Sequence, residues 1–296
     1  MSGSEKPSSR AGLRERARAC FARRAWIDAH AAFTSADRAQ PLAGEDLERF
    51  ATSAYLLGRD SEYIETLERA HKAYLVAGDG ARAARSAFWV GLRLLFRGEV
   101  ARANGWLMRA ERSIEDPQLD CVERGYLLLP TAQIRLDAGD HQAAYDCSVD
   151  AAAIGERFSE PDLVAVARHL QGRARLEQGK IAEGLCLLDE AMVAVAEREL
   201  SPVVTGLIYC SVIEGCRDVH ALERAHEWTT ALHCWCEEQP DMVAFTGLCR
   251  VHRAELMQFH GAWADALTEA ERAVERCRNV NERAAAAACY QQGEVH

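Results

Sequence analysis

Cysteine and histidine residues gather in the last third of the chain, and their types and spacing could do chemistry. His233 and Cys236 are three residues apart, as are Cys249 and His252, so each pair would share one face of a helix. Four such side chains could surround a zinc ion. However, Cys234 and Cys236 would point apart on a helix, and no zinc-finger spacing is present. Because cysteine also packs as a small hydrophobe, we predict no metal and no cofactor, with a thiol- or zinc-dependent sensor as an alternative.

Motifs of enzyme catalysis are absent from the sequence. There is no G-x-S-x-G nucleophile elbow and no G-x-x-x-x-G-K-[ST] phosphate loop, and no cysteine lies in a protease signature. Carboxylates such as Asp189, Glu190 and Glu271 fit the outward faces of helices. We therefore predict that the chain is not an enzyme and assign it no catalytic residues.

Five glycines mark the elements that must position any site, because they recur about every 40 residues. Successive intervals are 40, 41 and 40 residues, and the last interval of 82 residues spans two repeats. Such self-similarity is typical of stacked helical units that cover one another's apolar faces. In five of the expected pairs a glycine ends the first helix, because it adopts a left-handed backbone without strain. The five are Gly58, Gly98, Gly139, Gly179 and Gly261.

Small residues lie at fixed distances from these turns, as expected where two antiparallel helices approach closely. In the unit of Gly179 they are Gly172, Gly184 and Ala191, which lie seven before, five after and twelve after the turn. The first unit fits the same scheme with Arg24 in the turn position, while the sixth unit lacks a glycine there. Large residues are expected to fill the space between pairs. They are Trp26, Trp106, Leu107, Leu188 and Trp263.

The pattern resembles the tetratricopeptide repeat (TPR). It predicts an all-α fold, a right-handed α-solenoid of about seven TPR-like antiparallel helix pairs with a period of about 40 residues, plus a C-terminal helical stub. We expect residues 1–9 to be a disordered N-terminal tail and residues 10–296 to form one solenoid. Since the last helix has no partner, the solenoid is expected to be truncated before a further C-terminal region. Pro130 lies inside an apolar run and predicts a bend or a break in its helix.

Several stretches, among them AWIDAHAAFTSAD (25–37) and LERAHKAYLVAGD (67–79), look like the repeat region of LuxR-type bacterial transcriptional regulators. That resemblance implies a sensory or protein-interaction module, whose partner is a protein or peptide segment or a small effector molecule. In that family a helix-turn-helix near the far C-terminus binds DNA. None is recognisable in these 296 residues, so we expect no direct nucleic-acid binding by this region. A standalone TPR adaptor is the alternative, and self-association through the C-terminal end is a further option.

The overall composition is that of a folded chain with a negative charge. The formal net charge is −10, so the chain has no general attraction for nucleic acid or anionic lipid. No run of about 18 apolar residues could span a membrane, and the polar, arginine-rich start is not a signal peptide. The eleven cysteines follow no secreted disulfide framework. We therefore expect a cytoplasmic protein with reduced thiols.

The first helices of such repeats line a concave groove, which is the predicted binding site. The alignment places Phe88, Tyr126, Gln133, His169 and Arg173 on this face across three consecutive units. Apolar area with a few polar groups suits a ligand or peptide. Arg173 could hold a carboxylate or phosphate with two hydrogen bonds. The alternative is that the aromatic residues are core between repeats. We expect occupancy of the groove to shift the array between two arrangements.

Overall fold

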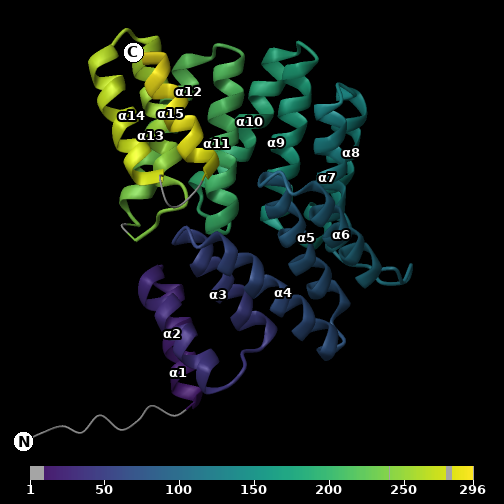
Figure 1. The fold of residues 1–296 in the computed structure, drawn as a ribbon. Coiled ribbons are helices and arrows are strands. Elements are labelled where there is room, and N and C mark those ends of the chain that lie inside the picture. Colours follow the sequence, from purple (N-terminus) through teal and green to yellow (C-terminus); the bar gives the residue numbers. More distant parts are fainter. Residues whose placement is uncertain (1–9, 240, 278–281, 296) are drawn as a thin grey trace, which may run out of the picture.

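The structure is a computed structural model that describes residues 10–239, 241–277 and 282–295. The predicted tail at residues 1–9 lies outside this described part. Within it the chain forms fifteen helices and no strand (Figure 1). The first helices of the pairs are α1 (Arg10–Ala22), α3 (Gly44–Leu56), α5 (Gly80–Phe96), α7 (Glu123–Asp137), α9 (Pro161–Glu177), α11 (Pro202–Asp218) and α13 (Thr246–Phe259). Their second helices are α2 (Trp26–Ala39), α4 (Asp60–Ala77), α6 (Val100–Ser113), α8 (His141–Phe158), α10 (Ile181–Ala196), α12 (Leu222–Glu237) and α14 (Trp263–Cys277). A last helix, α15 (Glu282–Val295), follows them.

The helices pack as seven sequential antiparallel pairs, and α15 packs against both helices of the last pair. The predicted all-α, TPR-like solenoid is therefore confirmed. Each first helix also contacts the first helix of a neighbouring pair, as α5 does with α7 and α7 with α9. Figure 1 shows the pairs following one another around an arc. Among the described residues, no helix is both long and apolar enough to cross a membrane.

The turn position of each pair has a left-handed backbone, as the glycine spacing predicts. The five predicted glycines have φ between 74° and 81°. The first pair uses Arg24 there, with φ 58°, and the sixth pair, which lacks the glycine, uses His220 with φ 59°. The turn geometry is therefore set by the repeat, and glycine is only the residue that adopts it with the least strain.

Small residues do bring the paired helices close together. A Cβ atom on Gly172 would lie 2.8 Å from Leu188 Cδ2, and one on Gly184 would lie 2.9 Å from the Gly172 carbonyl oxygen. Ala191, one helical turn beyond Leu188, is buried as well. A larger side chain at either glycine would force α9 and α10 apart, so the predicted role of these positions is confirmed.

The structure differs from two predictions about single residues, Trp263 and Pro130. Trp26, Trp106 and Leu188 are buried as expected, but Trp263 is 53% exposed, so its predicted packing role is wrong. It begins a second helix, at the same place in the repeat as Val100, which is 55% exposed. This position faces solvent unless something outside the repeat covers it.

Pro130 does not interrupt its helix. α7 runs without a break from Glu123 to Asp137, and Pro130 is buried inside it. The expected break is therefore not found. The missing N–H of the proline costs one helical hydrogen bond, which the packing around α7 outweighs.

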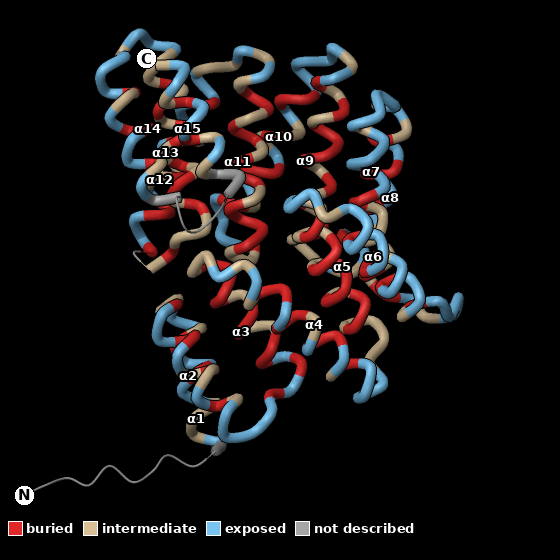
Figure 2. Tube along the Cα trace, viewed as in Figure 1, coloured by how far each residue is buried: buried red, intermediate tan, exposed pale blue. Residues whose placement is uncertain are grey.

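The arc of repeats closes where the segment 243–245 contacts the end of α3 and α11. The backbone N–H groups of Val243 and Ala244 donate hydrogen bonds to the Leu56 carbonyl oxygen at the end of α3, over 2.8 and 3.1 Å. The Phe245 ring lies 5.9 Å from the Tyr55 ring and packs so closely on Gly206 of α11 that a Cβ there would overlap it. We call this contact the seam. It joins the second pair to the sixth and seventh, and most of α11 beside it is buried (Figure 2).

Candidate functional site

Two of the residues predicted to line the groove are in the packed interior. Phe88 and Tyr126 are each 1% exposed, and their ring centroids lie 5.2 Å apart at the contact of α5 with α7. Neither ring therefore offers an open surface to a ligand. Their position agrees with the alternative that aromatic residues here form the core between repeats.

The third predicted residue, Gln133, lies apart from the others. It is exposed near the end of α7, and its amide nitrogen donates a hydrogen bond to Asp137 one turn later, over 2.7 Å. The structure does not bring it together with the two buried rings or with the residues of α9. Its predicted contact with a ligand stays a prediction.

The last two predicted residues, His169 and Arg173, lie one turn apart on α9 and face α11. His169 Nε2 is 2.6 Å from the Ser211 hydroxyl oxygen, and the Arg173 guanidinium pairs with Asp218 over 3.2 Å. Burial, together with the nearby Arg173 cation, lowers the pKa of His169 to about 3. Asp218 already occupies the guanidinium that was predicted to hold a ligand carboxylate, so that role stays a prediction.

The contact between Ser211 and His169 has the form of a nucleophile and a base, but its environment does not suit catalysis. A general base works best when its pKa lies near the operating pH, whereas the pKa of His169 is about 3. No carboxylate among the described residues hydrogen bonds to this imidazole. His169 is also buried, with 8% of its surface exposed. The pair is best explained as a hydrogen bond that satisfies two polar groups between α9 and α11.

A polar network that the sequence analysis missed crosses three consecutive pairs. Arg85 of α5 donates hydrogen bonds to Glu123 of α7 over 3.0 Å and to Glu160, just before α9, over 3.3 Å. The Tyr126 hydroxyl donates to Glu160 over 2.8 Å, and the Arg85 guanidinium lies 4.9 Å from the Tyr126 ring centroid. Glu123 and Glu160 are about one repeat apart in the sequence. Acidic residues that recur at the repeat period could therefore have predicted this network.

Negative charge exceeds positive charge in this network. A third carboxylate, Asp162, accepts a hydrogen bond from the Ser201 backbone N–H over 2.8 Å, and burial raises the pKa of Asp162. The surrounding acidic groups and the Tyr126 hydroxyl raise the pKa of Arg85 despite its burial. Arg85 is therefore a firmly charged cation shared between carboxylates. We call Arg85, Glu123, Glu160 and Asp162 the acidic patch.

The cysteine and histidine cluster does not assemble as four metal ligands. Cys236 and Cys249 do meet between α12 and α13, where their mutual hydrogen bond and burial raise the pKa of the Cys236 thiol. Cys234 is exposed, and His252 faces Glu255, whose carboxylate lies 3.4 Å from Nδ1. In the part of the chain that the structure describes, no three His, Cys, Asp or Glu side chains are grouped so that they could hold a metal. The buried thiols pack as small apolar groups.

Comparison with known proteins places the chain by its fold. No protein-family model and no curated protein matches it by sequence. A Rap protein complexed with competence and sporulation factor is similar, with a TM-score of 0.54 and 12% identity over 97% of both chains. The Rap conjugation gene regulator of the plasmid pLS20, in complex with the Phr* peptide, gives a TM-score of 0.52 and 11% identity. That match covers 97% of this chain and 74% of the other. These identities show a shared TPR-like fold alone, and the resemblance to LuxR-type regulators stays a prediction.

Proposed function

We propose that this chain is a non-catalytic module that binds a protein or peptide segment, and that the acidic patch receives a basic side chain of that segment. The observation that carries the proposal is the charge of the patch, in which the guanidinium of Arg85 is shared by two carboxylates, Glu123 and Glu160, while a third carboxylate, Asp162, lies nearby and bonds to a backbone N–H. A lysine or arginine side chain would supply the missing positive charge.

The exposure of the patch supports this proposal. The side chains of Arg85 and Glu160 are 26% and 23% exposed, so a partner can reach them, while Glu123 beneath is 6% exposed. A partly buried carboxylate is screened less by salt than a surface one, so a correctly placed cation gains more there. The net charge of −10 would also steer a basic segment toward the molecule.

The partner class is supported by what solenoids of this type offer. Stacked repeats present an extended surface, and here the first helices α5, α7 and α9 bring polar groups of successive pairs together. Both similar structures contain a bound factor or peptide, namely competence and sporulation factor and the Phr* peptide. A peptide partner for this chain is our inference from the fold and the patch together.

The proposal is tested by panning a random peptide library on the purified chain and measuring the affinity of the selected peptides by titration calorimetry. We expect enrichment of lysine and arginine in the selected peptides. Glu160→Gln removes one carboxylate of the patch and should weaken binding about tenfold, which corresponds to about 1.4 kcal/mol.

The matched control is Glu177→Gln at the far end of α9, the helix that begins directly after Glu160. Glu177 is exposed and makes no hydrogen bond or ion pair with a described residue, so its substitution should leave affinity unchanged. A library without basic enrichment, or equal affinities for both variants and the unaltered chain, would remove the acidic patch from the proposal.

The finer proposal is that binding serves the sensory part of a LuxR-type transcriptional regulator acting in the cytoplasm. It is supported by the sequence stretches that resemble that family and by described cysteines that are all free thiols. A small effector molecule is the second candidate ligand, and a standalone adaptor is the alternative. Reading the gene beyond the codon for His296 tests it, since a helix-turn-helix there would support a regulator and a stop codon would favour an adaptor.

A further inference from the structure

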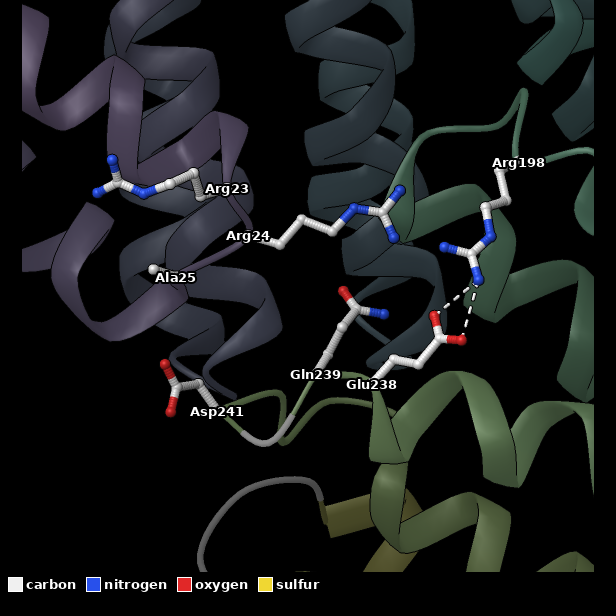
Figure 3. Close-up of a pocket in the computed structure, with 7 residues that line it drawn as sticks. All are labelled: Arg23, Arg24, Ala25, Arg198, Glu238, Gln239 and Asp241. Atoms are coloured by element: carbon white, nitrogen blue, oxygen red, sulfur yellow. Dashed lines mark hydrogen bonds and ion pairs between the residues drawn. The ribbon is translucent and has the colours of Figure 1, made fainter.

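A cavity of about 390 Å³ lies where the first pair meets the sixth, next to the seam (Figure 3). One wall is the turn between α1 and α2, and the opposite wall comes from the loop before α11 and the end of α12. Its volume falls in the range of small-molecule sites. The lining residues are Arg23, Arg24, Ala25, Arg198, Glu238, Gln239 and Asp241.

Two arginines that line the cavity have a left-handed backbone. Arg24 has φ 58° and Arg198 has φ 60°, a conformation that costs a residue with a side chain about 1–2 kcal/mol. Arg24 occupies the turn position in which five other pairs have glycine. Glycine would remove this strain. The presence of arginine at this position therefore indicates that its side chain has a role there. Strain of this kind is concentrated at functional sites.

The polar groups that face the centre of the cavity are not mutually satisfied. Arg198 donates two hydrogen bonds to Glu238, both over 2.9 Å. The Arg24 side chain extends toward this pair, but its guanidinium makes no hydrogen bond or ion pair with any described residue (Figure 3). Gln239 is 2% exposed, points into the same space, and its amide oxygen has no hydrogen-bond partner. A buried acceptor without a partner costs about 1–3 kcal/mol.

We propose that this cavity is a binding site for a small organic oxyanion, a carboxylate or a phosphate, that carries a hydrogen-bond donor beside its charged group. Arg24 binds the oxyanion with its two-pronged guanidinium. Arg198, at the opposite wall, is paired with Glu238 and neutralises that carboxylate, which leaves the charge of Arg24 for the ligand. The donor of the ligand reaches the Gln239 amide oxygen and satisfies it. This site is separate from the acidic patch, and the inference does not depend on the binding of a peptide.

Binding of the oxyanion in this cavity would also stabilise the closed arrangement of the repeats. The oxyanion contacts Arg24 of the first pair and Gln239 next to the seam, so it can bind both only when the arc of repeats is closed. A ligand that binds one arrangement stabilises it by mass action. The site therefore gives the solenoid a way to sense a small metabolite at a distance from the peptide-binding face.

Thermal unfolding tests the proposal with inorganic phosphate and sodium malate as probes, each at 10 mM against sodium chloride of equal ionic strength, because both anions carry a hydroxyl group that can donate to Gln239. We expect at least one of them to raise the melting temperature of the unaltered chain by about 2–4 °C. Arg24→Gly should lose this rise, although its melting temperature without the probe should equal or exceed that of the unaltered chain, because glycine relieves the strain. Arg198→Gly is a second variant with the same expected loss.

The matched control is His220→Gly, which relieves the same left-handed strain in the turn of the sixth pair but does not line the cavity. It should keep the full rise. A response to phosphate alone identifies a phosphorylated ligand, and a response to malate identifies a carboxylate. No rise in the unaltered chain, or an equal rise in Arg24→Gly and His220→Gly, would overturn the proposal.

Discussion

Trp26 and Trp263 occupy the same place in the first and the last pair, yet one is buried and the other is exposed. Each begins a second helix, two residues after a turn residue with a left-handed backbone, Arg24 or Gly261. Trp26 is 1% exposed and packs edge-on against Phe21, with ring centroids 5.5 Å apart, whereas Trp263 is 53% exposed. The local pattern is the same at both ends, so something else decides the burial.

The surroundings of the two ends differ. The first pair lies against the segment after α12, and Trp26 belongs to the same buried cluster as Met242 and Phe245. No described segment closes over the turn of the last pair in this way. The sequence of a repeat therefore fixes how its own two helices pack. Contacts with other parts of the array decide which of its outer side chains are buried.

The strongest test of this comparison is to remove each tryptophan in turn. Trp26→Ala should lower the free energy of unfolding by about 3–5 kcal/mol, because it empties a fully packed site. Trp263→Ala should change it by less than about 0.5 kcal/mol, as exposed substitutions usually do. Urea unfolding followed by circular dichroism measures both. Equal losses would show that the two ends are packed alike and would contradict this difference in burial.

Acid should destabilise the contact between α9 and α11 through His169. Unfolded histidine takes up a proton near pH 6.5, but the folded chain protonates His169 only near pH 3, so the unfolded state binds more protons between these values. Stability is therefore full above pH 6.5 and is lost as the pH falls. Between pH 6.5 and 4.5 the unaltered chain should lose about 2–3 kcal/mol more than His169→Gln. Parallel curves for both chains would contradict this role of His169.

The seam itself can be tested at a glycine. Gly206→Ala places a methyl group against the Phe245 ring, so we expect a loss of about 1–3 kcal/mol in the free energy of unfolding. Gly105→Ala on α6 meets no atom within 4 Å and should instead stabilise the chain by about 0.5–1 kcal/mol, as alanine does in an open helix. If both substitutions stabilise the chain, Phe245 does not press on α11 in solution.

Most of the repeat architecture could be predicted because it depends on short-range rules. The turn position follows from backbone sterics, which is why Arg24 could be placed in it without a glycine. Close approach of α9 and α10 follows from the absence of side chains at Gly172 and Gly184. These features need only the residues of one pair and its neighbour.

The candidate sites could be predicted only in part, because their residues meet across pairs. Phe88 and Tyr126 were assigned to the correct helices, but their spacing alone could not distinguish an open face from a core. The acidic patch joins residues about one repeat apart, and that period was visible in the sequence. The cavity joins Arg24 to Gln239, which belong to the first and the sixth pair, and no periodic signal connects them.

The helices, their pairing and their turns follow from the amino-acid sequence, since hydrophobic period, small residues and left-handed positions act within about 40 residues. The tertiary structure alone decided that the arc closes, through Val243 and Ala244 on Leu56 and through the Phe245 ring on Gly206. Small rotations between successive pairs add up along a solenoid, so where its distant parts meet depends on the whole chain. That meeting shapes the cavity at Arg24.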